Sequence, residues 1–522
     1  MNLLKSTGTI GALTLASRVL GLVRDTLFAR YVGAGFASDA FLVAFRLPNL
    51  FRALFAEGAF SSAFIPMFNH KVADPEGKGL ESGIAFAERA LAVLLPVLLA
   101  MTVLLELLAW PLTFVLSGRF NHVGPEEFAF AVSLSRLTIP YLALISLVSL
   151  FGGILNSLHK FWVNAAAPIL LNVTLIVALL AFRSEDPFVT ARNQALGVSI
   201  AGLLQLLWLL GAARANGVRL AFRWPRLDAD VRRLLTLILP TAAGAGAAQI
   251  NLVISTALSA ALLAHGSVTY IYLADRINQL PLGLIGIGLG TVLLPTISRQ
   301  LGAGQAEVAL ATQNRGLELA LLLTLPATTA LMVCGEPIAA GLFGYGRFTA
   351  DDVHATAQSL AAFSLGLPSY VLVKVLTPGF YARHDTATPT RYALVSMAAN
   401  LAGNLMLILP LAHVGPPLAT ALASTLNVVL LYRTLVARGH FIADDRLRHR
   451  VPRLLVASLA MGVTLWLLRG FLTPYVQGSW AMRFGALAVL VGGGTIVYGL
   501  AALAIGAFTL KDLGLLRRAP RA

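Results

Sequence analysis

The sequence predicts an all-α polytopic membrane protein, and three observations lead to this fold class. Only 12% of the 522 residues are charged, whereas an ordinary soluble domain is roughly 25% charged. Mean hydropathy is +0.79, and apolar runs long enough to cross about 30 Å of hydrocarbon as helices recur along the whole chain. These runs do not alternate between apolar and polar residues, as residues 90–105 illustrate, so a transmembrane β-barrel is excluded.

Apolar runs bounded by charged residues, glycine or proline define about fourteen predicted transmembrane helices. The first six cover residues 4–31, 37–66, 89–116, 128–156, 162–182 and 194–213. The next six cover residues 235–263, 269–298, 316–338, 354–381, 392–411 and 414–432. A final pair covers residues 454–472 and 484–509.

Lysine and arginine are concentrated in alternate loops of this plan. One side of the membrane receives the basic residues between 214 and 233, those between 433 and 453, and those of the tail from Lys511, while the other side receives few. Because cytoplasmic loops carry the excess of basic residues, we expect a multi-pass protein of the bacterial inner membrane with both termini in the cytoplasm. The loops then account for most of the formal charge of +15, and no nucleic-acid partner is expected.

Enzyme signatures are missing from the sequence. The single cysteine, Cys334, excludes an intramolecular disulfide and a metal cluster of thiolates. There is no glycine-rich phosphate loop with GK[ST], no HExxH and no GxSxG. We therefore expect a transporter without a cofactor, driven by a coupling ion, the membrane potential or the gradient of its own substrate.

A weak internal repeat predicts two homologous lobes. Residues 44–50 resemble residues 274–280, and both segments lie in the second helix of a predicted six-helix unit. Transporters built from repeats place the substrate between them, so we expect a central cavity. The predicted domains are an N-terminal six-helix lobe at 1–215, a C-terminal six-helix lobe at 216–440, and two C-terminal helices with a basic tail at 441–522.

Ionisable residues inside the predicted helices are the main functional signal. They lie in the first, second and eighth of these helices: Arg18, Arg24, Asp25, Asp39, Arg46, Arg52, Glu57, Asp275 and Arg276. Each charge at the bilayer centre costs about 2.5–3.5 kcal/mol on insertion scales, so we expect these side chains to face a cavity instead of lipid. Arg18 and Asp25 are seven residues apart, as are Asp39 and Arg46, which puts each pair nearly on one helical face.

Arginine in particular predicts an anionic substrate. Its guanidinium stays charged when desolvated and binds two phosphate oxygens at once, so the substrate is expected to bear phosphate. The carboxylates are expected to orient the arginines and to balance their charge. The alternative is that these residues form interhelical ion pairs that only fix packing, or extend to the membrane interface.

A cation site in the second lobe is a weaker hypothesis. Asn400 and Asn404 lie one turn apart in the eleventh predicted helix. No carboxylate accompanies them, so hydrogen bonding between helices is the preferred interpretation. No other metal site is expected.

The N-terminal motifs carry a family resemblance. Residues 17–21 read SRVLG, Arg24 and Asp25 follow, residues 38–41 read SDAF, residues 47–52 read LPNLFR and residues 55–60 read FAEGAF. With residues 272–276 and the PGFYAR segment at 378–383, this pattern resembles the MurJ (MviN) family of the multidrug/oligosaccharidyl-lipid/polysaccharide exporter superfamily.

The resemblance implies a lipid II flippase of bacterial peptidoglycan synthesis. It implies two six-helix lobes around a V-shaped cavity and a last helix pair that forms a groove for the polyprenyl tail. Its functionally important residues match Arg18, Arg24, Arg52 and Arg276 and the carboxylates of Asp25, Asp39 and Glu57. The implied partners are lipid II, which is an anionic polyprenyl-diphosphate lipid, together with membrane lipids and cell-wall synthesis proteins.

Three alternatives remain open at this point. The first two are a flippase of another polyprenyl-linked glycan and a cation-coupled multidrug exporter, although a surplus of arginine suits an anion better than a cationic drug. The third is a non-transporting scaffold, which the short loops and the charges at membrane depth disfavour.

Overall fold

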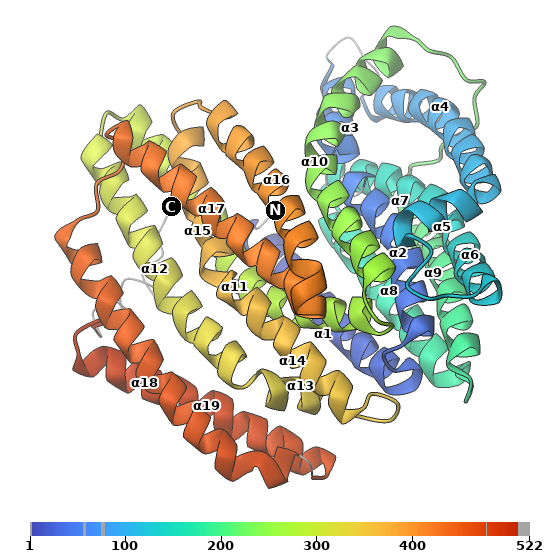
Figure 1. Ribbon diagram of the computed structural model, residues 1–522. Helices are drawn as coiled ribbons and strands as arrows, with labels where there is room; N and C mark the ends of the chain where they lie inside the picture. Colours follow the sequence, from blue (N-terminus) through green and yellow to red (C-terminus); the bar gives the residue numbers. More distant parts are fainter. Residues whose placement is uncertain (1–2, 56–58, 75–78, 477, 510–522) are drawn as a thin grey trace. The chain divides into compact units, whose positions relative to one another are not determined.

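The computed structural model describes residues 3–55, 59–74, 79–476 and 478–509 (Figure 1). In these residues the secondary structure is α-helical, with one 3-10 turn and no strand, which confirms the all-α fold class. Ten helical segments of the described chain are long and apolar enough to cross a membrane. One of them, Ala387–Ala437, holds two of the predicted helices, and the total of fourteen stays a prediction.

The chain packs into two compact units, Met1–Thr269 and Tyr270–Ala522. The helix Ala229–Leu262, which is predicted to begin the second lobe, therefore packs with the first unit. The lobe boundaries at 215 and 440 rest on the sequence repeat and stay predictions. The helices of the first unit are α1 (Leu3–Val32), α2 (Phe36–Phe55), α3 (Ala59–Ala73), α4 (Leu80–Leu107), α5 (Ala109–Ser117), α6 (Pro125–Thr138), α7 (Pro140–Ser157), α8 (Phe161–Ala181), α9 (Pro187–Ala215) and α10 (Ala229–Leu262).

The second unit contains the remaining helices. Of these, α11 (Ser267–Gly302) begins in the last residues of the first unit. The others are α12 (Ala306–Val333), α13 (Gly335–Phe343), α14 (Ala350–Leu365), α15 (Leu367–Tyr381), α16 (Ala387–Leu411), the 3-10 turn η1 (Ala412–Val414), α17 (Gly415–Ala437), α18 (Asp445–Val476) and α19 (Trp480–Ala504).

In the first unit, the packing places α1 along α8, and α8 and α7 along α9. The helices α3 and α10 also pack against each other, and α2 contacts α6, α7 and α9. Proline interrupts the predicted helix at 128–156: α6 ends at Thr138 and α7 begins at Pro140, which has no N–H to donate, although the two together form one candidate span, Pro125–Ser157. The second predicted helix, at 37–66, is formed by two helices, α2 and α3.

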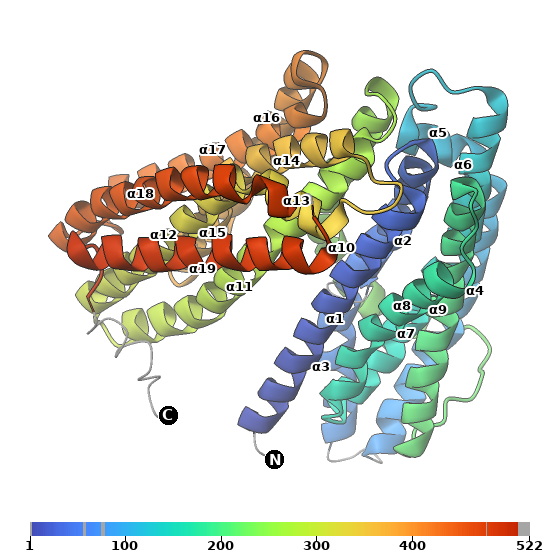
Figure 2. The same cartoon turned by 90° about the horizontal axis from the view of Figure 1, so that it is seen from below.

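The second unit has an apolar core built from α11, α12, α15 and α17. Its fully buried members include Ile297, Ala320, Val371 and Leu435. The C-terminal pair α18 and α19 run side by side in both views (Figures 1 and 2), and α18 also packs along α12. The pair therefore contacts the rest of the second unit through α12 and α13.

A charged cluster strengthens the contact between α12 and α18. The carboxylate of Glu318 accepts two hydrogen bonds of 3.1 Å from Arg446, and it also pairs with Arg315 and Arg450. Arg315 pairs in addition with Asp444, just before α18 begins. Only 9% of the Glu318 side chain is exposed, so this carboxylate lies among three guanidinium groups with little access to water.

The PGFYAR segment ends α15 and leads into a polar corner. The Asp385 carboxylate accepts hydrogen bonds from the backbone N–H of Thr388 at 2.9 Å and from Arg438 at 2.6 Å. The hydrogen bonds from Thr388 and from Arg438 lower the pKa of Asp385 to about 2. The carboxylate is therefore ionised near neutral pH, and it ties the start of α16 to the end of α17.

Gly366 separates α14 from α15 where the two helices pass α17. A Cβ atom at this position would lie 2.8 Å from the Cα atom of Ala421, which is backbone and cannot move aside. We expect Gly366→Ala to lower the free energy of unfolding by about 1–3 kcal/mol, the usual range for overpacking. The measurement is denaturant unfolding of the purified protein in detergent.

Gly211 of α9 is the matched control for this substitution. A Cβ atom there would meet nothing within 4 Å. Gly211→Ala should leave stability unchanged or raise it slightly, because alanine is the better helix former. Equal stability of the two variants would contradict the packing argument at Gly366.

Candidate functional site

Arg24 is a buried charge of the first unit with hydrogen bonds to two other side chains. Its side chain is buried and donates from Nε and Nη2 to Oδ1 of Asp25, at 3.0 and 2.6 Å, and from Nη1 to Oδ1 of Asn172 at 3.2 Å. The amide nitrogen of Asn172 donates to the carbonyl of Ser17 at 2.9 Å, which directs its oxygen toward Arg24. Packing of α1 on α8 therefore positions a buried guanidinium with a neighbouring carboxylate and an amide.

The other predicted residues of α1 and α2 occupy different environments. Arg18 is exposed while Asp25 is buried, so these two residues, which are seven positions apart, do not share one environment. Asp25 pairs with Arg24 instead. Arg46 is half-buried and donates to Thr256 Oγ1 of α10 at 2.8 and 3.0 Å. Arg52 is half-buried near the end of α2.

Aromatic rings pack together near the connection between α1 and α2. Phe28, one turn after Arg24, packs on Phe41 of α2 with ring centroids 5.1 Å apart. Phe41 in turn stacks on Phe45, the residue before Arg46. Aromatic contacts therefore link the end of α1 to the first half of α2, between the two arginines in the sequence.

Asp39 anchors the start of α11. Its buried carboxylate accepts hydrogen bonds from the backbone N–H groups of Gly266 and Thr269, at 2.7 and 2.9 Å, and from the Thr269 hydroxyl at 2.7 Å. These donors lie in the last residues of the first unit, where the chain enters α11. A carboxylate at a helix N-terminus is favoured by the unpaired N–H groups and the helix dipole, so Asp39 acts here as a positioning residue.

The predicted residues of α11 lie in the second unit. The Nε of Arg276 donates to the Tyr272 hydroxyl at 3.2 Å, and its guanidinium lies 5.3 Å from the centre of the Tyr272 ring. Asp275 is half-buried and accepts a hydrogen bond from Gln279. Glu57, the remaining predicted residue, lies outside the described residues.

The asparagine pair of α16 forms hydrogen bonds with protein groups. The amide of Asn404 donates to Asn400 Oδ1 at 2.9 Å, and Asn400 donates to Thr420 of α17 at 3.0 Å. This arrangement fits the preferred interpretation of interhelical hydrogen bonding. In the part of the chain that the structure describes, no group of three or more His, Cys, Asp or Glu side chains could hold a metal ion.

Sequence reasoning missed the polar partners of the charged residues. Asn172, Thr256 and Thr269 each bond a predicted site residue across more than 100 positions of sequence. The available signal was their polarity within or beside apolar helices. Polarity alone does not identify the partner of each residue, because threonine and asparagine in membrane helices form hydrogen bonds with many different groups.

The sequence matches the family described as "Lipid II flippase MurJ" over residues 28–485, which is most of the chain. The chain belongs to the MurJ family. It is similar over nearly its whole length to other members of that family.

Two MurJ relatives and one solved MurJ structure illustrate this similarity. The "Probable lipid II flippase MurJ" of Rhizobium meliloti is 40% identical over 519 residues, covering 98% of this chain and 95% of the relative. The protein of the same description from Vibrio cholerae serotype O1 is 37% identical over 523 residues, covering 98% and 97%. The structure titled "Lipid II flippase MurJ, inward closed conformation" superposes with a TM-score of 0.77 at 24% identity, covering 94% and 97%, which shows the shared fold.

Proposed function

We propose that this chain is a transporter that moves lipid II from the cytoplasmic to the periplasmic leaflet of the bacterial inner membrane by alternating access. Membership of the MurJ family supports the substrate, since its relatives are described as lipid II flippases. The observation that carries the mechanism is the buried Arg24, held by Asp25 and Asn172 in α1, the first of the transmembrane helices predicted from sequence. A guanidinium kept at membrane depth suits a lipid whose headgroup is a diphosphate.

The proposed cycle begins with the cavity open to the cytoplasm, where both termini lie. Guanidinium groups, Arg24 and Arg276 among them, bind the diphosphate, while the polyprenyl chain stays in lipid beside α18 and α19. Contacts to the diphosphate that are stronger in the closed state shift the population toward that state when the substrate binds. In this proposal Asp39 holds the start of α11 in place, and a coupling ion or the membrane potential supplies the energy.

Complementation of a bacterial strain depleted of its own flippase tests this function. We expect the wild-type chain to restore growth and Arg276→Glu to abolish it, because a carboxylate at this position repels the diphosphate. Arg192→Glu, which reverses an exposed charge on α9, should grow like the wild type. Immunoblots of membrane fractions establish that all three proteins are inserted. Normal growth with Arg276→Glu would contradict the proposal.

A further inference from the structure

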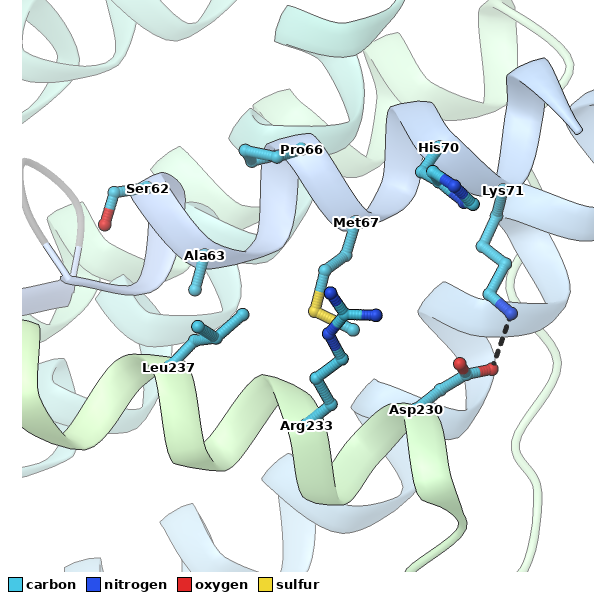
Figure 3. A pocket seen from close by; sticks show the side chains of 9 residues that line it. All are labelled: Ser62, Ala63, Pro66, Met67, His70, Lys71, Asp230, Arg233 and Leu237. Carbon is cyan, nitrogen blue, oxygen red and sulfur yellow. Dashed lines mark ion pairs between the residues drawn. The ribbon is translucent and has the colours of Figure 1, made fainter.

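A pocket opens between α3 and α10 in the first unit (Figure 3). Its volume is about 390 Å³, which lies in the range of about 300–1,000 Å³ that is typical of small-molecule sites. Met67 of α3 and Arg233 of α10 point toward each other across it. Lys71 and Asp230 lie at one end, and Ala63 and Leu237 lie close together toward the other.

The polar end of the pocket has a surplus of positive charge. Lys71 Nζ lies 2.9 Å from Asp230 Oδ2, and Arg89 Nη2 lies 3.1 Å from the same oxygen. Arg89 also pairs with Asp228 at 2.8 Å, so two carboxylates are matched by Lys71 and Arg89. Within the described residues the Arg233 guanidinium has neither an ion pair nor a hydrogen bond, which leaves one positive charge for a ligand.

Apart from the Ser62 hydroxyl, the end of the pocket away from Lys71 is apolar. Ala63, Pro66 and Met67 line it from α3, and Leu237, one turn beyond Arg233, lines it from α10. Methionine is unbranched and polarisable, so it adapts to irregular apolar groups such as hydrocarbon chains. A ligand that fills the pocket therefore needs a negative group at one end and carbon at the other.

We propose that the α3–α10 pocket binds a phosphate-bearing amphiphile. The Arg233 guanidinium and the Lys71 ammonium contact the phosphate oxygens, while the first carbons of an acyl or prenyl chain lie against Met67 and Leu237. A phosphate group fits because its free oxygens, two in a diester and three in a terminal phosphate, can accept from both cations at once. This site stands apart from the proposed transport function, because none of its lining residues belongs to the intramembrane arginine set.

Binding to the purified full-length protein in detergent tests the proposal, with native mass spectrometry as the readout. Three probes separate the sources of phosphate: dioctanoyl phosphatidylglycerol for bulk phospholipid, farnesyl diphosphate for a prenyl diphosphate, and inorganic phosphate. We expect at least one of the two amphiphiles to bind the wild type, and Arg233→Gln to weaken that binding about tenfold or more. Arg233→Lys should retain most of the affinity, because it keeps the charge.

Arg232→Gln is the matched control. Arg232 is the preceding residue of α10, is equally exposed and does not line the pocket, so its loss removes the same charge without touching the site. We expect this variant to bind like the wild type. Equal affinity of Arg233→Gln and Arg232→Gln would overturn the proposal, and so would inorganic phosphate that binds as tightly as both amphiphiles.

Discussion

Replacing Arg24 by alanine is expected to abolish transport and to destabilise the protein at once. The guanidinium and the Asp25 carboxylate are both buried, with 7% and 4% of their side chains exposed. Removal of one partner leaves the other charge in a poorly solvated place, which typically costs about 3–5 kcal/mol. Arg24→Ala should therefore lower both the unfolding free energy in detergent and the rate of headgroup translocation.

A double variant separates these two effects. In Arg24→Ala/Asp25→Asn the buried carboxylate is gone, so most of the lost stability should return. Transport should stay absent, because no guanidinium is left at this position to meet the diphosphate. If stability and transport returned together, Arg24 would be a structural residue, which is the packing alternative for the intramembrane charges.

Loss of the Glu318 carboxylate is expected to have the second largest effect. Glu318→Gln leaves Arg315, Arg446 and Arg450 close together without their shared partner, and mutual repulsion then opposes the contact of α18 with α12. Because Arg315 and Arg446 are about one-third exposed, water screens part of this loss. We expect the free energy of unfolding to fall by about 2 kcal/mol.

Glu336 provides the control, since it also pairs with an arginine of α18. Both Glu336 and its partner Arg469 are well exposed, with 41% and 37% of their side chains accessible. Exposed pairs contribute about 0–1 kcal/mol, so Glu336→Gln should be nearly neutral. A similar loss of stability in the two glutamine variants, measured by denaturant unfolding in detergent, would show that the cluster around Glu318 is no stronger than a surface pair.

The fold class could be predicted from sequence because it depends on properties that each residue carries by itself. Low charge and long apolar runs report the free energy of transfer into lipid, which decides whether a segment forms a membrane helix. Proline acts in the same local way, since its missing N–H interrupts the hydrogen-bond ladder where α7 begins at Pro140. The packing of α10 with the first unit depends on contacts between distant segments, and the repeat alone did not indicate it.

The candidate site could be predicted only as a set of residue types. The cost of burying charge singles out Arg24 and Asp39, and both are buried. What each one binds depends on helix packing: Asn172 reaches Arg24 only because α8 lies on α1, and Thr269 reaches Asp39 from the first turn of α11. The Glu318 cluster could not be predicted from sequence, because its arginines come from two helices, α12 and α18, that are far apart in the chain.

The central claim is that buried guanidinium groups meet a negatively charged lipid headgroup, and transport by the isolated protein tests it most directly. Lipid II is placed in the outer leaflet of vesicles that contain only this protein, and arrival of its headgroup in the lumen is measured. We predict transfer with the wild type, and none beyond empty vesicles with the folded Arg24→Ala/Asp25→Asn variant. Transfer at the wild-type rate by that variant would contradict the account.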